Sequence, residues 1–368
     1  MLGFIEKLAW PYYTMRPYHN WRHAQGVCAT AFMLAERCRH CGIHVSIEVL
    51  VWAALFHDAL FGKDPREFGC STPEELSAKV AAEEMRKLGY LEHMIAAVID
   101  AIKPTNAGVM PVTVEAKILR AADLSRMAGA YSDFREDFDK LAAEFGFEGG
   151  WDFFWPNLHG MVAYLWPEIR LTPQYWGTNH ASEWHTNVAR NIIRNYGVLC
   201  AERGEEPKVL IEIGPGRLPI SLFRKHTPLE LIIGVEPSQA DRKVAAVLSV
   251  ETAKLRNSAP EIILPGTADA LPIPDDAGDI VMANVALRCP DALSPQELLR
   301  VLSLSDGRLE VIESYTPTYG ADSIEVASRQ IEAMLPGFSL IAEDHDFDFS
   351  GYPCVDPEAF RLIFGRTN

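Results

Sequence analysis

The chain has 368 residues, of which 48% are hydrophobic and 23% are charged, a globular composition with enough length for two domains. Its formal net charge of −16 disfavours a sequence-independent grip on nucleic acid, which requires Lys and Arg to neutralise phosphates, so small-molecule ligands are expected instead. No apolar run approaches the ~20 residues that cross a bilayer, the N-terminus lacks a signal-peptide pattern, and seven cysteines suit reduced thiols, so a cytoplasmic location is expected.

The first half of the sequence has the pattern of helices, with Ala, Leu, Glu and Met at helical spacing and few β-branched alternations. One helix is expected from His23, and a second ends with the apolar run at 49–56. A third begins at 71–75, where a hydroxyl N-cap, a proline and early carboxylates stand together. The aromatic-rich segment 151–166 would fill a core or a subunit interface, which leaves a homo-oligomer open. Further helices are expected over 91–102, 113–129, 133–145, 151–166 and 181–199.

A histidine and an aspartate, His57 and Asp58, follow the apolar run at 49–56. Burying a carboxylate beside an imidazole is costly unless something pairs with both, and a metal ion would do so. His23 lies upstream and Asp123 downstream, both on predicted helices. These four residues are expected to hold one divalent ion, and the mixed donor set leaves Mn, Fe, Co, Ni, Zn and Mg all open.

The order of a histidine, a His-Asp pair and an aspartate resembles the metal signature of HD-domain phosphohydrolases, in particular the small predicted metal-dependent members. Residues 18–23 match the Tyr-His-Asn-x-x-His element of that family, and residues 73–78 match its Asn-Glu-x-x-Ser-Ala element apart from the asparagine. An Asp-Leu pair at 123–124 and an Ala-Arg-Asn element within 188–192 complete the match. The resemblance covers residues 1 to about 200. It implies an all-α domain that hydrolyses a nucleotide or a related small phosphate ester.

Two departures from the family bear on the chemistry. Residues 104–106 are Pro-Thr-Asn where the family often has a further histidine, which argues for one metal and against a di-iron oxygenase. Phe61 stands where some HD nucleotidases place a glutamate. Besides the metal ligand Asp58, the candidate catalytic side chains are therefore Glu75 and Asp64, with ordinary surface carboxylates as the alternative.

Three basic residues near the signature are candidates for binding substrate phosphate. They are Arg16, His19 and Lys103, because guanidinium, imidazolium and ammonium groups suit that charge. The alternative is that they are solvated at helix edges.

The composition changes at residues 203–207, a polar turn that is expected to link two domains, 1–203 and 204–368. Beyond it, short apolar strands alternate with helical segments, the pattern of a doubly wound α/β sheet. Strands are expected at 208–213, 231–236, 261–266, 279–284 and 308–313, with closing strands at 338–341 and 360–364.

The first strand of the second half is followed by Gly214 and Gly216, and the second strand ends in Glu236. Glycines at this turn allow the backbone to approach a cofactor, and an acid at the second strand can accept hydrogen bonds from ribose hydroxyls. The third glycine of a dinucleotide fingerprint would fall at 219, where the chain has Pro219, which disfavours NAD.

Residues 205–368 resemble class I S-adenosylmethionine-dependent methyltransferases. The matches are residues 212–216, Glu236, the loop 266–272 with its acid, and the fourth-strand segment 279–284. Leu218 and Pro219 depart from the family pattern and leave open a scaffold that has lost its cofactor. The resemblance implies that S-adenosylmethionine is bound by Glu212, Gly214, Gly216, Glu236, Asp269 and Asn284.

Together these features predict a bifunctional cytoplasmic enzyme, an all-α HD phosphohydrolase followed by a Rossmann-like methyltransferase domain. The favoured substrates are nucleotide-like small molecules, with a methyl acceptor in the same or a neighbouring reaction. Two alternatives remain: a methyltransferase whose HD domain only senses a nucleotide, and a non-catalytic ligand-binding protein of an assembly.

Overall fold

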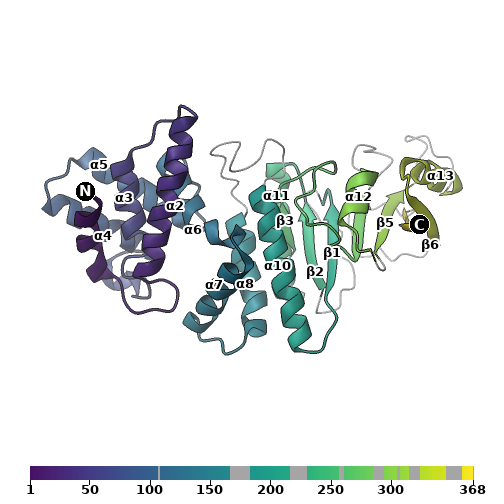
Figure 1. Cartoon of the computed structure of the whole chain (residues 1–368), viewed down its shortest axis with the longest axis horizontal. Helices are drawn as coiled ribbons and strands as arrows, with labels where there is room; N and C mark the ends of the chain where they lie inside the picture. The colour runs from purple at the N-terminus through teal and green to yellow at the C-terminus, as the bar shows by residue number, and fades with distance from the viewer. Residues whose placement is uncertain are drawn as a thin grey trace. The chain divides into compact units, whose positions relative to one another are not determined.

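A computed structural model gives the fold of the chain. It describes residues 1–106, 108–165, 183–215, 230–256, 261–284, 294–304, 307–314, 324–344 and 359–367. The described residues pack as two compact units, one up to Phe153 and one from Phe154 onward. The first is helical and the second is built on a β-sheet (Figure 1). The functional boundary predicted after residue 203 stays a prediction.

The first unit is all-α, as the sequence predicts. Four short 3-10 helices, Trp10–Tyr12, Pro65–Phe68, Lys103–Thr105 and Ser125–Ala128, join its longer elements. The helix expected over 113–129 ends earlier, at Asp123, where the Ser125 hydroxyl donates to the Ala122 carbonyl at 2.6 Å and the chain tightens into the last 3-10 turn. The helices are α1 (Leu2–Ala9), α2 (Trp21–His40), α3 (Ile47–Phe56), α4 (Pro73–Lys87), α5 (Glu92–Ile102), α6 (Val114–Asp123), α7 (Tyr131–Glu144) and the start of α8 (Gly150–Leu165).

The central element of this unit is α3, which is apolar on every side. All eight residues from Val49 to Phe56 are buried, as expected for a helix that is hydrophobic all round. The Ser46 hydroxyl caps its N-terminus by accepting from the Val49 amide. α3 contacts α2, α5 and α6, so the residues that follow its last turn emerge in the interior of the domain.

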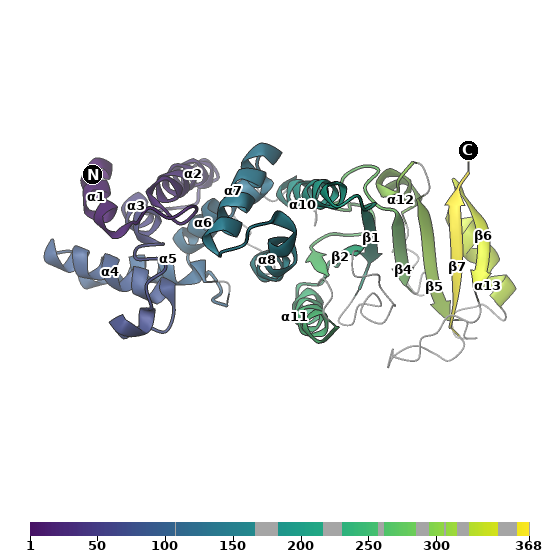
Figure 2. The same cartoon turned by 90° about the horizontal axis from the view of Figure 1, so that it is seen from below.

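The second unit contains the rest of α8, α10 (Glu183–Glu202) and a seven-stranded sheet in the order β3-β2-β1-β4-β5-β7-β6 (Figure 2). The strands run parallel except β7, which is antiparallel to both β5 and β6. Helix α11 packs on β3 and α13 on β6. The strands are β1 (Lys208–Ile213), β2 (Glu230–Val235), β3 (Ile262–Leu264), β4 (Ile280–Asn284), β5 (Arg308–Ser314), β6 (Phe338–Asp344) and β7 (Ala359–Arg366), and the remaining helices are α11 (Gln239–Arg256), α12 (Pro295–Val301) and α13 (Ile324–Met334).

This arrangement confirms the predicted doubly wound, Rossmann-like sheet. Strand β1 pairs with β2 on one side and with β4 on the other, so the strand order reverses at β1. In open α/β sheets of this kind, ligands bind in the crevice beyond the carboxyl ends of the strands at such a reversal. Among the described helices, none combines the length and apolarity of a membrane span.

Candidate metal centre

Three helix ends deliver the four predicted metal ligands. Asn20 caps α2 by accepting from the His23 amide at 3.2 Å, which fixes His23 in the first turn. His57 forms the cap at the end of the buried helix α3, and Asp58 follows it. Asp123 is the last residue of α6. Residues that are far apart in the sequence therefore meet because α2 and α6 pack together and both contact α3.

The ligand atoms converge on one point. Those of His23, His57 and Asp58 all lie within 4.8 Å of one another. Asp58 Oδ2 is 3.0 Å from His57 Nε2 and 3.4 Å from His23 Nε2. Asp123 Oδ1 is 3.2 Å from His23 Nε2 and 3.6 Å from His57 Nε2. The structure thus brings together the four residues that the sequence singles out.

The donor set fits a divalent cation. The Nδ1 atom of His57 lies 2.8 Å from the Ala54 carbonyl, so this nitrogen donates its proton there and leaves the lone pair on Nε2. His57 Nε2 and Asp58 Oδ2 are both buried, and although they are 3.0 Å apart, neither makes a hydrogen bond of good geometry with a described residue. Buried polar atoms without partners are costly, and coordination to a metal would satisfy both.

The charges of the cluster are strongly coupled. Burial alone would lower the pKa of His23, but Asp123 and Asp58 more than offset burial and raise this pKa to about 9. The same carboxylates raise the pKa of His57 well above its ordinary value against the effect of burial. The imidazoles in turn hold the pKa of Asp58 and of Asp123 below the ordinary range, although burial acts in the opposite direction. A bound cation would compete with protons for these sites, as metal binding generally does.

Glu144, at the end of α7, holds the loop before α2 in place and was not singled out from the sequence. Its carboxylate accepts from the backbone amides of Tyr18 and His19 at 2.9 and 3.0 Å. Oε1 lies 2.6 Å from His19 Nδ1 and 3.1 Å from Arg16 Nε. The contacts span more than 120 residues of sequence, so no local pattern indicates them.

The three predicted phosphate-binding residues have different surroundings. His19 stacks on Phe61, with ring centroids 3.7 Å apart, while Arg16 lies over the same ring. Both are bound to Glu144, so they support the loop beside the metal-ligand candidates. Lys103 is exposed in the 3-10 helix after α5, and its ammonium makes no ion pair with any described residue. Their predicted role in phosphate binding stays a prediction.

The two candidate catalytic carboxylates have local structural roles. Asp64 caps a 3-10 turn by accepting from the Arg66 amide and pairs with the Arg66 guanidinium at 2.7 Å. The Glu75 amide donates to Oγ1 of the N-cap residue Thr72, and its carboxylate accepts from the Ser71 amide just before that cap. No described hydrogen bond or ion pair joins either one to the four-residue cluster. Their catalytic role stays a prediction with a competing structural explanation.

A buried arginine, Arg120, holds the segment 104–106, where HD phosphohydrolases often have a further histidine. Arg120 donates through Nη1 to the carbonyls of Pro104, Asn106 and Val109, at 2.5, 2.9 and 3.1 Å. Thr105 is itself buried and donates to the Ile102 carbonyl. The segment is thus fixed by backbone contacts, with no further imidazole near the four ligands there.

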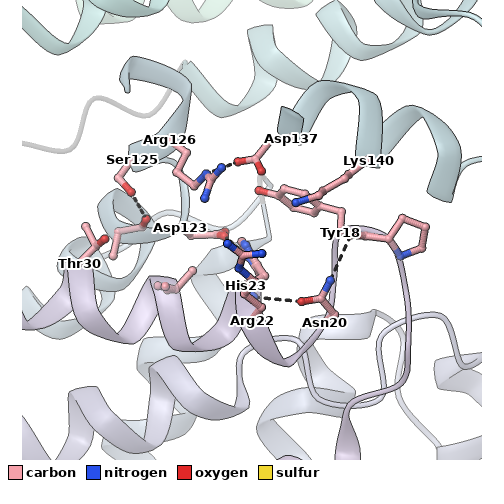
Figure 3. A pocket seen from close by; sticks show the side chains of 14 residues that line it. Tyr18, Asn20, Arg22, His23, Thr30, Asp123, Ser125, Arg126, Asp137 and Lys140 are labelled. Atoms are coloured by element: carbon pink, nitrogen blue, oxygen red, sulfur yellow. Dashed lines mark hydrogen bonds and ion pairs between the residues drawn. The ribbon is translucent and has the colours of Figure 1, made fainter. Parts of the chain in front are cut away.

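A cavity of about 240 Å³ opens beside the cluster (Figure 3). Its wall includes the two metal-ligand candidates His23 and Asp123. The Tyr18 ring, which also lines it, lies 4.6 Å from the His23 ring. Burial raises the pKa of Asp137 above its ordinary value although Arg126 lies beside it. The polar and charged part of the remaining wall consists of Asn20, Arg22, Thr30, Ser125, Arg126, Asp137 and Lys140.

In the second unit, four of the predicted cofactor residues lie at or near the carboxyl ends of β1, β2 and β4; they are Glu212, Gly214, Glu236 and Asn284. Gly214 has φ +65°, a conformation that favours glycine, and its amide donates to the Val235 carbonyl. Glu236 is buried just beyond β2 and accepts from the Ser238 amide at 2.8 Å. Glu212 is buried within β1.

The other predicted cofactor residues are less completely described. Asp269 is exposed in the turn between Thr267 and Ala270. Asn284 ends β4, and only its backbone is described. Gly216, Leu218 and Pro219 lie outside the described residues.

A protein-family model matches part of the helical unit. Residues 20–127, which include all four metal-ligand candidates, match the family model described as HD domain. No curated protein matches the chain.

Among solved structures, the chain is similar to a SAM-dependent methyltransferase from Aquifex aeolicus, with 12% identity, 48% of this chain and 88% of that chain covered, and a TM-score of 0.32. It is also similar to a putative S-adenosyl-L-methionine-dependent methyltransferase from Methanococcus maripaludis, with 16% identity, coverage of 50% and 94%, and a TM-score of 0.30. At TM-scores this low, the two similarities carry no argument about the fold, which is given by the strand order.

Proposed function

We propose that this chain, in which an HD domain precedes a methyltransferase-like α/β domain, hydrolyses the phosphate ester of a nucleotide or related small metabolite with one divalent metal ion. The observation that carries the proposal is the convergence of His23, His57, Asp58 and Asp123. Two of the buried ligand atoms, His57 Nε2 and Asp58 Oδ2, lie side by side without a hydrogen bond of good geometry to a described residue. A divalent cation bound there would supply the Lewis acidity that phosphate-ester hydrolysis needs.

The protein's own groups prepare this centre for an anionic substrate. The Ala54 carbonyl holds His57 in the tautomer that presents Nε2, and the Tyr18 ring packs against His23. Arg22 lines the cavity in the first turn of α2 and makes no ion pair with a described residue. Acids, not cations, are favoured at a helix N-terminus, so a cation here is better suited to attracting a phosphate than to stabilising α2.

For the second domain, the proposal is binding of S-adenosylmethionine and methyl transfer to a small metabolite. Three features support it: the strand-order reversal at β1, the left-handed turn at Gly214 and the buried acid Glu236 beyond β2. Methyl transfer needs little beyond alignment of a nucleophile with the sulfonium carbon. That both activities act on related metabolites is motivated by the fusion of the two domains.

Small-molecule substrates and a cytoplasmic location belong to the same proposal. Five cysteines are described, and no two of them form a disulfide with each other. Free thiols suit a reducing compartment. The acidic net charge of −16 supports small substrates over nucleic acid.

The test is phosphate release from nucleotides and sugar phosphates with Mn, Co, Ni or Mg added. Wild type is compared with Asp58→Ala, and with Asp64→Ala and Glu75→Ala as surface carboxylate variants. Release that disappears only in Asp58→Ala supports the proposal and assigns the other two carboxylates to capping. Absence of release with every metal would contradict it and favour a domain that only binds a nucleotide. Calorimetric titration with S-adenosylmethionine tests the second domain separately.

A further inference from the structure

The cavity beside the metal centre is small and polar. Its volume of about 240 Å³ lies below the ~300 Å³ at which pockets for drug-sized ligands begin. His23 and Asp123 form part of its wall, so an ester whose phosphate lies at the metal centre would place its organic group in this cavity. The occupant is therefore of about the size of a pentose.

One acceptor in the cavity has unused hydrogen-bonding capacity. The side chain of Asp137, on α7, is 14% exposed, and its Oδ2 lies 2.6 Å from Arg126 Nε. Despite this ion pair, Oδ2 is buried and receives no hydrogen bond of good geometry from a described residue. Because Oδ2 is covered, the acceptor positions that a ligand can reach are those of Oδ1, to which no described residue donates a hydrogen bond.

The cations near Asp137 are shared with a second acid, Glu136. Arg126 is 45% exposed and also lies 3.7 Å from Glu136, while Lys140 pairs with Glu136. In Figure 3, Arg126, Asp137 and Lys140 lie on one side of the cavity and Arg22 and Asn20 on the other, with His23 and Asp123 between them. A ligand between the two sides would meet an acceptor and cations together.

We propose that Asp137 accepts a hydrogen bond from a hydroxyl of the substrate's organic group and so selects phosphate esters of sugars or polyols over esters of apolar alcohols. This inference rests on the proposed phosphohydrolase function. A neutral amide would accept a weaker hydrogen bond than the carboxylate, because hydrogen bonds to charged groups are roughly twice as strong.

The test uses two esters with the same number of carbon atoms, ribose 5-phosphate and pentyl phosphate, which differ in their hydroxyls. Asp137→Asn should lower kcat/KM for ribose 5-phosphate by about 10- to 100-fold and leave pentyl phosphate unchanged within about 3-fold. Asp139→Asn is the matched control, because this exposed aspartate on the same helix pairs with Arg135 outside the cavity. It should change neither value. An equal loss on both esters, or no loss, would overturn the inference.

A binding measurement separates this inference from the proposed function. If wild type releases phosphate from neither ester nor from any nucleotide or sugar phosphate of the panel above, the proposed function fails. Calorimetric titration of both esters into Asp58→Asn then decides the inference. Tighter binding of ribose 5-phosphate that is lost in the Asp58→Asn, Asp137→Asn double variant supports it. Equal binding of the two esters, or binding of neither, overturns it.

Discussion

Replacing Glu144 with glutamine tests how the loop before α2 is held. The carboxylate is 1% exposed and accepts from two backbone amides, and His19 and Arg16 lie beside it. Glutamine keeps the shape of the side chain but removes the negative charge and one acceptor oxygen. His19 and Arg16 would then have no carboxylate to pair with at this position. We expect Glu144→Gln to lower the free energy of unfolding at neutral pH.

The size of the loss follows from the pKa of Glu144, which is lowered from 4.5 to about 2; burial opposes this shift, and the contacts with His19 and the backbone amides outweigh it. A carboxyl with that shift contributes on the order of 3 kcal/mol to stability at neutral pH. Screening by nearby solvent reduces the expected loss to about 2 kcal/mol. Because the folded-state pKa is depressed, this contribution is complete above the unfolded-state value of 4.5 and disappears as pH falls toward 2.

Urea unfolding of wild type and Glu144→Gln at neutral pH and at about pH 3.5 measures both effects. The difference between them should shrink from about 2 to about 1 kcal/mol as the pH falls. Glu148→Gln, a substitution at an exposed position, is the control and should stay within about 0.5 kcal/mol of wild type. A Glu144→Gln effect that is the same at both pH values would refute the electrostatic explanation.

Other substitutions test the remaining contacts. Asn20→Ala removes the cap of α2 and should cost about 1 kcal/mol in urea unfolding and weaken Mn²⁺ binding in calorimetry, whereas unchanged metal affinity would show that the cap does not position the cluster. Gly62→Ala should destabilise the domain more than Gly69→Ala. Both glycines have positive φ, but only at Gly62 would the added Cβ collide with the Arg16 guanidinium. Equal losses in thermal unfolding would argue against that contact. Glu236→Gln should weaken S-adenosylmethionine binding about tenfold in calorimetric titration, and equal affinity would remove this acid from the cofactor site.

The convergence of the four metal-ligand candidates could be predicted because they lie at the ends of strongly patterned helices. The apolar run before His57 predicts a buried helix, and α3 is buried along its whole apolar length. The strands of the second domain are also close to their predicted ranges, since a parallel sheet buried on both faces produces continuous apolar runs.

Contacts between distant parts of the chain could not be predicted. Glu144 binds a loop more than 120 residues earlier, and Asp137 reaches the cavity only because α7 packs beside it. Nothing in the local sequence separates these acids from their exposed neighbours on α7. The local contacts of Asp64 and Glu75, by contrast, join them to residues at most four positions away, so the sequence next to each acid indicates them.

The most direct test of the phosphohydrolase proposal is a metal titration followed by phosphate release. Chelator-treated protein should be inactive, and activity should rise with added Mn²⁺ to a plateau at one equivalent per chain. Asp58→Ala should remain inactive across the same titration. Release that persists after chelation, or that appears equally in Asp58→Ala, would contradict a catalytic metal at His23, His57, Asp58 and Asp123.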